Sequence, residues 1–82
     1  ELSEERRKDL VKTLKNMAEE TRVRMRAARR QAMETAKKMQ KEGNLTEDDL
    51  KSAETQIQKL TDKFVADVDV QLTSKEADIM KI

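Results

Sequence analysis

The chain has 82 residues, of which 43% are charged and 35% hydrophobic, and its net charge is +1. It contains no cysteine and no histidine, which excludes disulfides, thiol chemistry and the usual zinc ligands. With one glycine, no proline and a single aromatic residue, the composition is typical of long packed helices.

A first helix is predicted from about residue 4 to residue 42. Ser3 is a good N-cap, and the two glutamates that follow it suit the positive end of the helix dipole. Gly43 should end this helix, because glycine adopts the left-handed backbone conformation at little cost. Apolar or small residues recur every seven positions and so predict a packing seam, made of Val11, Ala18, Met25, Ala32 and Met39 in one series and Leu14, Thr21, Ala28 and Thr35 in the other.

A second helix is predicted from about residue 47 to residue 81, after a turn over residues 43–46. Thr46 is its expected N-cap, with acidic residues in the first turn, and Leu45 can pack on Leu50. Its apolar seam is predicted at Leu50, Ala53, Ile57, Leu60, Phe64, Val68, Leu72, Ile79 and Ile82.

The two predicted helices indicate an all-α fold. Because the turn between them is short, they should form a long antiparallel helical hairpin. At the rise of an α-helix its arms would be roughly 50–60 Å long. Two helices alone rarely bury enough apolar surface for stability. We therefore expect the hairpin either to be part of a three-helix bundle or to be completed by self-association, as a homodimer, into a four-helix bundle.

Charge is distributed unevenly along the chain. Residues 1–43 hold thirteen Lys or Arg against eight Asp or Glu, whereas residues 44–82 hold five against nine. On a helical wheel the cations of the first helix fall within about a third of the circumference, away from the apolar seam. This basic band consists of Lys8, Lys12, Lys15, Arg22, Arg26, Arg29, Arg30 and Lys37, with Glu19 as the one acid inside it.

The centre of the basic band is made of arginine, whose planar fork suits phosphate groups. Arg22, Arg26, Arg29 and Arg30 could therefore lie along a nucleic acid, with Arg29 at the border of the seam so that its stem packs while its head stays in water. Because no aromatic platform accompanies them, such binding would use phosphate contacts and shape and would weaken with salt. The alternative is an ordinary solvated face of a helical bundle.

Other classes of function find little support in the sequence. No group of residues has the pattern of a catalytic site, so no enzyme activity and no cofactor are expected. The acids Glu47, Asp48 and Asp49 fit no calcium-loop spacing and suit the start of a helix better, so no metal site is expected. No apolar run is long enough to cross a membrane.

Five short motifs follow one another along essentially the whole chain. These are Leu2-Ser3-Glu4-Glu5-Arg6-Arg7-Lys8-Asp9-Leu10, then Arg26 with Arg29-Arg30, then Leu45-Thr46-Glu47-Asp48, then Ile57-Gln58-Lys59-Leu60-Thr61-Asp62, and Lys75-Glu76-Ala77-Asp78-Ile79-Met80. Together they resemble the bacterial and organellar ribosome recycling factor family. The resemblance implies a three-helix bundle with a small β-rich domain inserted after its first helix. This chain resembles the second and third helices only, so the N-terminal helix and the inserted domain are expected to be absent from it.

The resemblance also implies a function. Members of the family split the spent ribosome into subunits together with elongation factor G, which performs the GTP hydrolysis, and their helical domain lies along large-subunit ribosomal RNA. By resemblance, Arg26 and Arg29 match RNA-contacting arginines, and Arg6, Arg7 and Arg30 are further candidates. The expected location is the cytoplasm, or alternatively an organelle. The competing hypothesis is a coiled-coil-like structural module that binds only protein.

Overall fold

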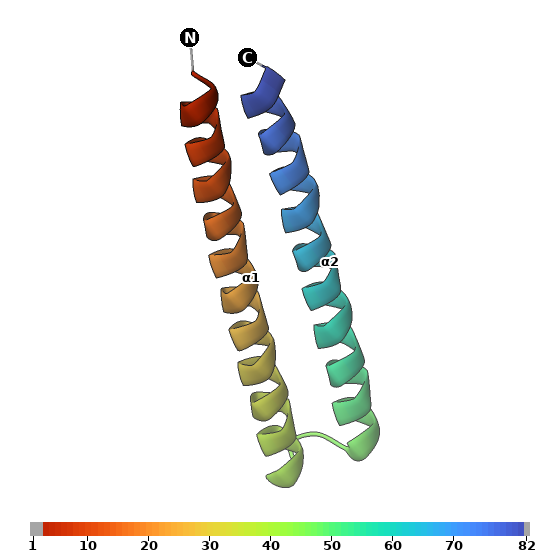
Figure 1. Ribbon diagram of the computed structural model, residues 1–82. Helices are drawn as coiled ribbons and strands as arrows, with labels where there is room; N and C mark the ends of the chain where they lie inside the picture. Colours follow the sequence, from red (N-terminus) through yellow and green to blue (C-terminus); the bar gives the residue numbers. More distant parts are fainter. Residues whose placement is uncertain (1–2, 82) are drawn as a thin grey trace.

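The computed structural model describes residues 3–81 and consists of a single helical hairpin. Helix α1 spans Glu4–Lys41 and helix α2 spans Glu47–Lys81. The two helices run antiparallel, so both chain ends lie at the same end of the rod (Figure 1). The rod measures 61 Å along its longest axis and 15 and 10 Å across. The prediction of an all-α antiparallel hairpin is confirmed.

Both ends of α1 are capped in the way that the sequence predicts. The side chain of Ser3 accepts a hydrogen bond from the backbone N–H of Arg6, at 3.2 Å. At the other end, Gly43 has a φ of +82°, in the left-handed region. Its N–H donates to the carbonyl of Gln40, and the N–H of Asn44 donates to the carbonyl of Met39. These two bonds satisfy carbonyls that the helix itself leaves free.

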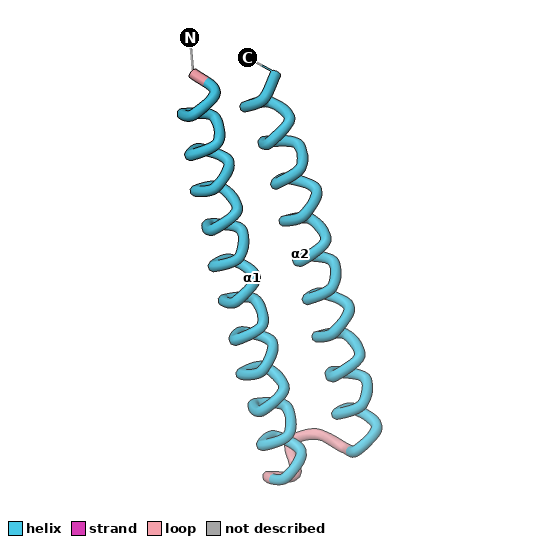
Figure 2. The backbone as a smooth tube through the Cα atoms, in the orientation of Figure 1, coloured by secondary structure: helices cyan, strands magenta, loops and turns pink. Residues whose placement is uncertain are grey.

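The turn that joins the helices leads directly into the cap of α2 (Figure 2). The Thr46 hydroxyl accepts a hydrogen bond from the N–H of Asp49, and the Asp49 carboxylate accepts one from the N–H of Thr46, at 3.0 and 3.1 Å. This reciprocal pair is the capping-box arrangement, with aspartate in the place of glutamate. Thr46 is therefore confirmed as the N-cap residue.

The contact between the helices is narrow. Ala18 and Ala36 are the only buried residues among those described, at 8% and 7% exposed, and both belong to α1. On α2 the side facing α1 is half-buried and follows the series Ile57, Thr61, Val65, Val68, Leu72 and Ile79.

The predicted seam of α2 is wrong at Leu60 and Phe64, which are 54% and 51% exposed. Two helices touch along one line, and only the residues nearest to that line are covered. Leu60 and Phe64 lie to one side of it, next to Ile57. Thr61 and Val65 occupy the places in the contact that were predicted for Leu60 and Phe64. Ile82, the last residue of the predicted seam, lies outside the described residues.

One face of the hairpin is consequently apolar and open. Two shallow grooves between the helices lie along it. We call this face the apolar strip; its side chains are Leu14, Met17, Thr21, Met25, Ala28 and Ala32 of α1 and Ile57, Leu60, Phe64, Val68 and Leu72 of α2. Across residues 3–81, neither helix has a stretch apolar and long enough to span a membrane.

Candidate nucleic-acid interface

The other face of the hairpin is polar, and most of its cations come from α1. An open groove on this face is lined by Arg26, Arg29 and Arg30 of α1 and by Gln58 and Asp62 of α2, among others. Arg29 and Thr61 line both this groove and one of the grooves of the apolar strip. They therefore mark the boundary between the two faces, as the sequence predicts for Arg29.

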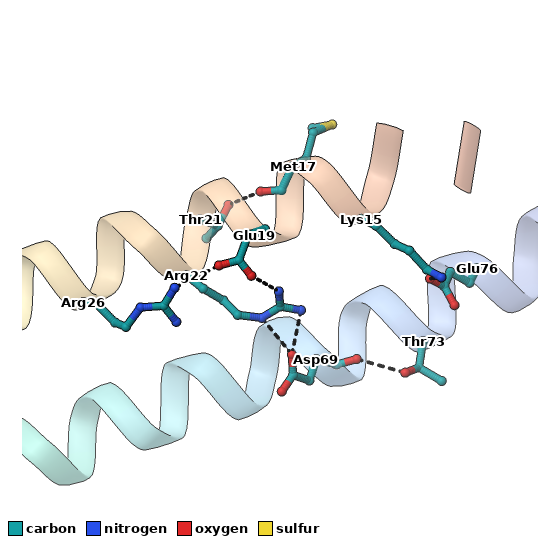
Figure 3. Close-up of polar contacts among 9 residues, drawn as sticks. All are labelled: Lys15, Met17, Glu19, Thr21, Arg22, Arg26, Asp69, Thr73 and Glu76. Atoms are coloured by element: carbon teal, nitrogen blue, oxygen red, sulfur yellow. Dashed lines mark hydrogen bonds and ion pairs between the residues drawn. The ribbon is translucent and has the colours of Figure 1, made fainter. Parts of the chain in front are cut away.

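Acids of α2 pair with cations of α1 in a regular antiparallel register, shown in part in Figure 3. The Lys15 ammonium lies 3.8 Å from the Glu76 carboxylate. Seven residues further along α1, Arg22 binds Asp69, which precedes Glu76 by seven residues on α2, with Nη2 at 2.9 Å and Nε at 3.0 Å from the same oxygen. We call this series of pairs between the helices the interhelical ladder.

A third step of the interhelical ladder runs through an amide. The Nε–H of Arg29 donates to the Gln58 side-chain oxygen at 2.7 Å, and the Gln58 amide donates to the Asp62 carboxylate at 2.8 Å. Arg29 and Asp62 again lie seven residues from the previous pair on their own helices. The same seven-residue step on both helices fixes how far one can slide past the other.

Glu19 joins two arginines of the basic band on α1 (Figure 3). Its two carboxylate oxygens lie 2.8 Å from Arg26 Nη2 and 3.0 Å from Arg22 Nη1. Hydrogen bonds from Arg26, and next from Arg22, hold the pKa of the Glu19 carboxyl below its ordinary value. The hydrogen bond to Asp69 chiefly, with help from Glu19, raises the pKa of Arg22. The carboxylates of Glu19 and Asp69 thus offset the charges of the two arginines.

The predicted RNA-binding arginines differ in how open they are. Arg6, Arg26 and Arg30 are exposed, and Arg29 is half-buried at the seam. The side chain of Arg22 is only 19% exposed, because it reaches across to α2. Arg7 is also half-buried, and its Nε is covered without a hydrogen-bond partner among the described residues.

These placements leave two arginines facing water in the middle of the polar face. Arg30 makes no ion pair within residues 3–81, and Arg26 pairs only with Glu19. Both lie on the same side of α1 as the groove that Arg29 lines. Such a surface can contact successive phosphates of a nucleic acid, whereas Arg22 is already occupied by two carboxylates.

Sequence reasoning missed the acids that pair with this arginine row. Asp62, Asp69 and Glu76 repeat every seven residues, as Lys15, Arg22 and Arg29 do on the other helix. Opposed charges in matching heptads are a recognisable signal of paired helices. That signal was available once the antiparallel hairpin had been inferred.

Comparison with known proteins identifies relatives of the chain. A family model described as Ribosome recycling factor matches residues 1–80. A ribosome-recycling factor of Akkermansia muciniphila is 58% identical over 81 residues, which is 99% of this chain and 43% of that protein. One from Clostridioides difficile is 53% identical over 99% of this chain and 44% of its own length. A third, from Caldicellulosiruptor bescii, is 50% identical over 100% of this chain and 45% of its own length.

The chain therefore spans less than half the length of these relatives. No solved structure gives a significant match to it.

Proposed function

This chain belongs to the ribosome recycling factor family, and on that premise we propose that its polar face docks on large-subunit ribosomal RNA. Arg26, Arg29 and Arg30 are the proposed phosphate contacts, and Arg6 is a further one toward the open end of the hairpin. The protein that carries this face would take part in splitting ribosomes after termination. It would do so as a stiff component between the subunits and not as an enzyme.

One observation supports this proposal above the others. Arg26 and Arg30 are exposed on the same side of α1 as a groove that the half-buried Arg29 also lines. Arginines on consecutive turns along one side of a helix can contact successive phosphates of a nucleic-acid backbone. A small ligand would need its contacts gathered at one point instead. Arg26 and Arg30 line neither groove of the apolar strip, so helix packing on that strip leaves these two arginines open.

The proposed contact is to phosphates and to the shape of RNA, not to bases. Phe64 is the only aromatic residue of the chain, and it lies on the apolar strip. Without aromatic side chains on the polar face, unpaired bases have no stacking platform there. Specificity would then come from the length and straightness of the hairpin, which must match a groove or ridge of folded RNA.

For Arg22 and Arg7 the geometry favours another role. Arg22 is bound by Asp69 and Glu19, and Arg7 is half-buried with its Nε covered. A cation that already has two carboxylate partners gains little from a phosphate. Their RNA contact, expected from the sequence, stays a prediction, and we propose that they chiefly hold the hairpin together.

The partners of the complete activity are proposed from the family. We propose the ribosome as the binding partner of this face, and elongation factor G as the protein that works with it and hydrolyses GTP. In this proposal the hairpin itself catalyses no reaction. It acts through its rigid shape and the positive charge of its polar face.

Binding to isolated large ribosomal subunits across a range of salt concentrations tests the proposal. Affinity should fall steeply as salt rises, since each phosphate contact releases a counterion. A weak response that does not change with salt would instead favour the alternative function, a helical module that binds protein only. The observation behind that alternative is the apolar strip, where Leu60 and Phe64 are about half exposed.

A further inference from the structure

Glu19 occupies an unexpected position for a surface that should attract anions. It is the one acid in the basic band of α1, and it lies between two arginines, binding Arg22 with one oxygen and Arg26 with the other. Arg22 has a second carboxylate partner in Asp69, but Arg26 has no ion-pair partner other than Glu19 within residues 3–81. The charge of Arg26 is therefore cancelled by Glu19 alone.

We propose that Glu19 is a positioning residue that sets how strongly the polar face binds RNA, by holding Arg26 until a phosphate displaces it. This inference rests on the proposed function, because it concerns the same surface. It adds a residue that opposes binding at the centre of an interface that otherwise favours it.

The geometry explains why Glu19 acts on Arg26 more than on Arg22. The Arg22 side chain is 19% exposed and remains tied to α2 by its ion pair and its hydrogen bond with Asp69 when Glu19 leaves. The Arg26 side chain is 52% exposed and loses the only carboxylate partner that it has within residues 3–81. A phosphate approaching Arg26 is repelled by the Glu19 carboxylate, whose Oε1 lies 2.8 Å from Arg26 Nη2, and can bind that nitrogen only if the carboxylate turns aside.

Such an arrangement has two consequences for binding. It lowers the affinity for any stray polyanion, since the centre of the arginine row is neutral in the free protein. It also keeps the Arg26 guanidinium extended along the polar face in the free state, so less side-chain freedom is lost when RNA arrives. Discrimination thus comes from the requirement that the RNA fit well enough to compensate for the lost ion pair.

The test compares Glu19→Gln with Glu20→Gln in the 82-residue chain. Both changes raise the net charge by the same amount, but Glu20 is exposed and makes no ion pair within residues 3–81. Affinity is measured by titration of a short RNA duplex and of large ribosomal subunits, at several salt concentrations, with helicity checked by circular dichroism. We expect Glu19→Gln to raise the affinity for the duplex roughly two- to fivefold, the range that an exposed ion pair can supply, and Glu20→Gln to raise it less.

A double-mutant cycle makes the test specific to Arg26. In an Arg26→Gln background, Glu19→Gln should raise the affinity no more than Glu20→Gln does. Equal effects of the two glutamate variants, or an unchanged effect in the Arg26→Gln background, would overturn the role of Glu19 while leaving the RNA-binding function intact. The proposed function itself fails if the unsubstituted chain shows no salt-dependent binding to the RNA duplex and none to large ribosomal subunits.

Discussion

Arg22 of α1 holds Asp69 of α2 through two N–H groups that share one carboxylate oxygen, at 2.9 and 3.0 Å. The two residues are 47 positions apart in the sequence, so this contact links the arms of the hairpin. Next to it along the rod, Lys15 lies near Glu76, and Arg29 reaches Asp62 through Gln58. The arginine row is thus divided between holding the helices in register and facing outward.

The first prediction separates these two roles by stability. Arg22→Gln should lower the midpoint of thermal unfolding by a few degrees, because it removes a contact between the helices. Arg26→Gln should change the midpoint less, because its ion pair with Glu19 lies within α1. Thermal melts followed by circular dichroism, at one fixed protein concentration, measure both. Exchanging the pair, with Arg22→Asp and Asp69→Arg together, should recover part of the loss; equal midpoints for Arg22→Gln and Arg26→Gln would contradict the assignment.

The second prediction concerns the outward arginines. Arg26→Gln and Arg30→Gln should each weaken binding to large ribosomal subunits and lower the slope of log affinity against log salt by about one. Arg24→Gln is the matched control, since Arg24 is exposed on α1 but lies about 200° around the helix from Arg26. If Arg24→Gln weakens binding as much as the other two, the polar face has no special part in it. Reversing both Arg26 and Arg30 to Glu should abolish binding without loss of helicity, because both side chains are exposed and neither contacts α2 through an ion pair within residues 3–81.

The third prediction uses the acid titration of Glu19. Because Arg26 chiefly lowers the pKa of this carboxyl, the ion pair is fully formed at neutral pH and is lost as pH falls through that lowered value. Arg26→Gln should therefore raise the pKa of Glu19 toward its ordinary value, as followed by carboxyl NMR signals. Arg24→Gln should leave the titration unchanged. An unaltered Glu19 titration in Arg26→Gln would mean that the two side chains do not pair in solution.

Much of the hairpin could be read from the sequence because its signals are local. Ser3, Gly43 and Thr46 each act within four residues of their own position, through hydrogen bonds that any helix end requires. The predicted seam of α2 is wrong at Leu60 and Phe64 because heptad spacing gives the period of the apolar residues only. It does not show which edge of the apolar side of α2 contacts α1. That choice depends on the other helix.

The arginines of α1 show the same limit of a pattern read within one helix. Spacing places Arg22 and Arg26 on one side of α1. On a helical wheel, however, Arg22 lies about 40° closer to α2 than Arg26 does, and it pairs with Asp69 of α2. A pattern within one helix cannot separate a cation that faces a partner helix from one that faces water. Pairing the heptads of both helices, as the interhelical ladder does, supplies the missing information.

The fourth prediction tests the turn. Gly43→Ala should destabilise the hairpin by about 1 kcal/mol, because a residue with a Cβ resists the left-handed conformation that Gly43 adopts at φ +82°. Apart from Gly43 and its two chain neighbours, no described residue has an atom within 4 Å of the position that the Cβ would take, so the cost is one of backbone conformation and not of crowding. Gly43→Asn should cost less, since asparagine tolerates this conformation. Chemical denaturation measures both, and an equal loss for the two variants would point to a different cause.

The fifth prediction concerns the apolar strip, and we expect the 82-residue chain to pair with a second copy of itself through it. The reason is the small core: two alanines are the only buried residues among those described, which is too little to hold an isolated hairpin. Pairing strip to strip would cover Phe64 and Met17, now 51% and 58% exposed, and complete a four-helix bundle.

Sedimentation equilibrium measures this association. Phe64→Gln should shift the chain toward the monomer and reduce its helicity together, since pairing and folding are then coupled. Val70→Gln is the matched control, because Val70 is 68% exposed but lies on the outer side of α2, away from the strip and the polar face. A stable helical monomer at all concentrations would contradict the pairing. Because the arginines lie on the opposite face, the paired form should bind RNA, and two copies would present two such faces on opposite sides of the bundle.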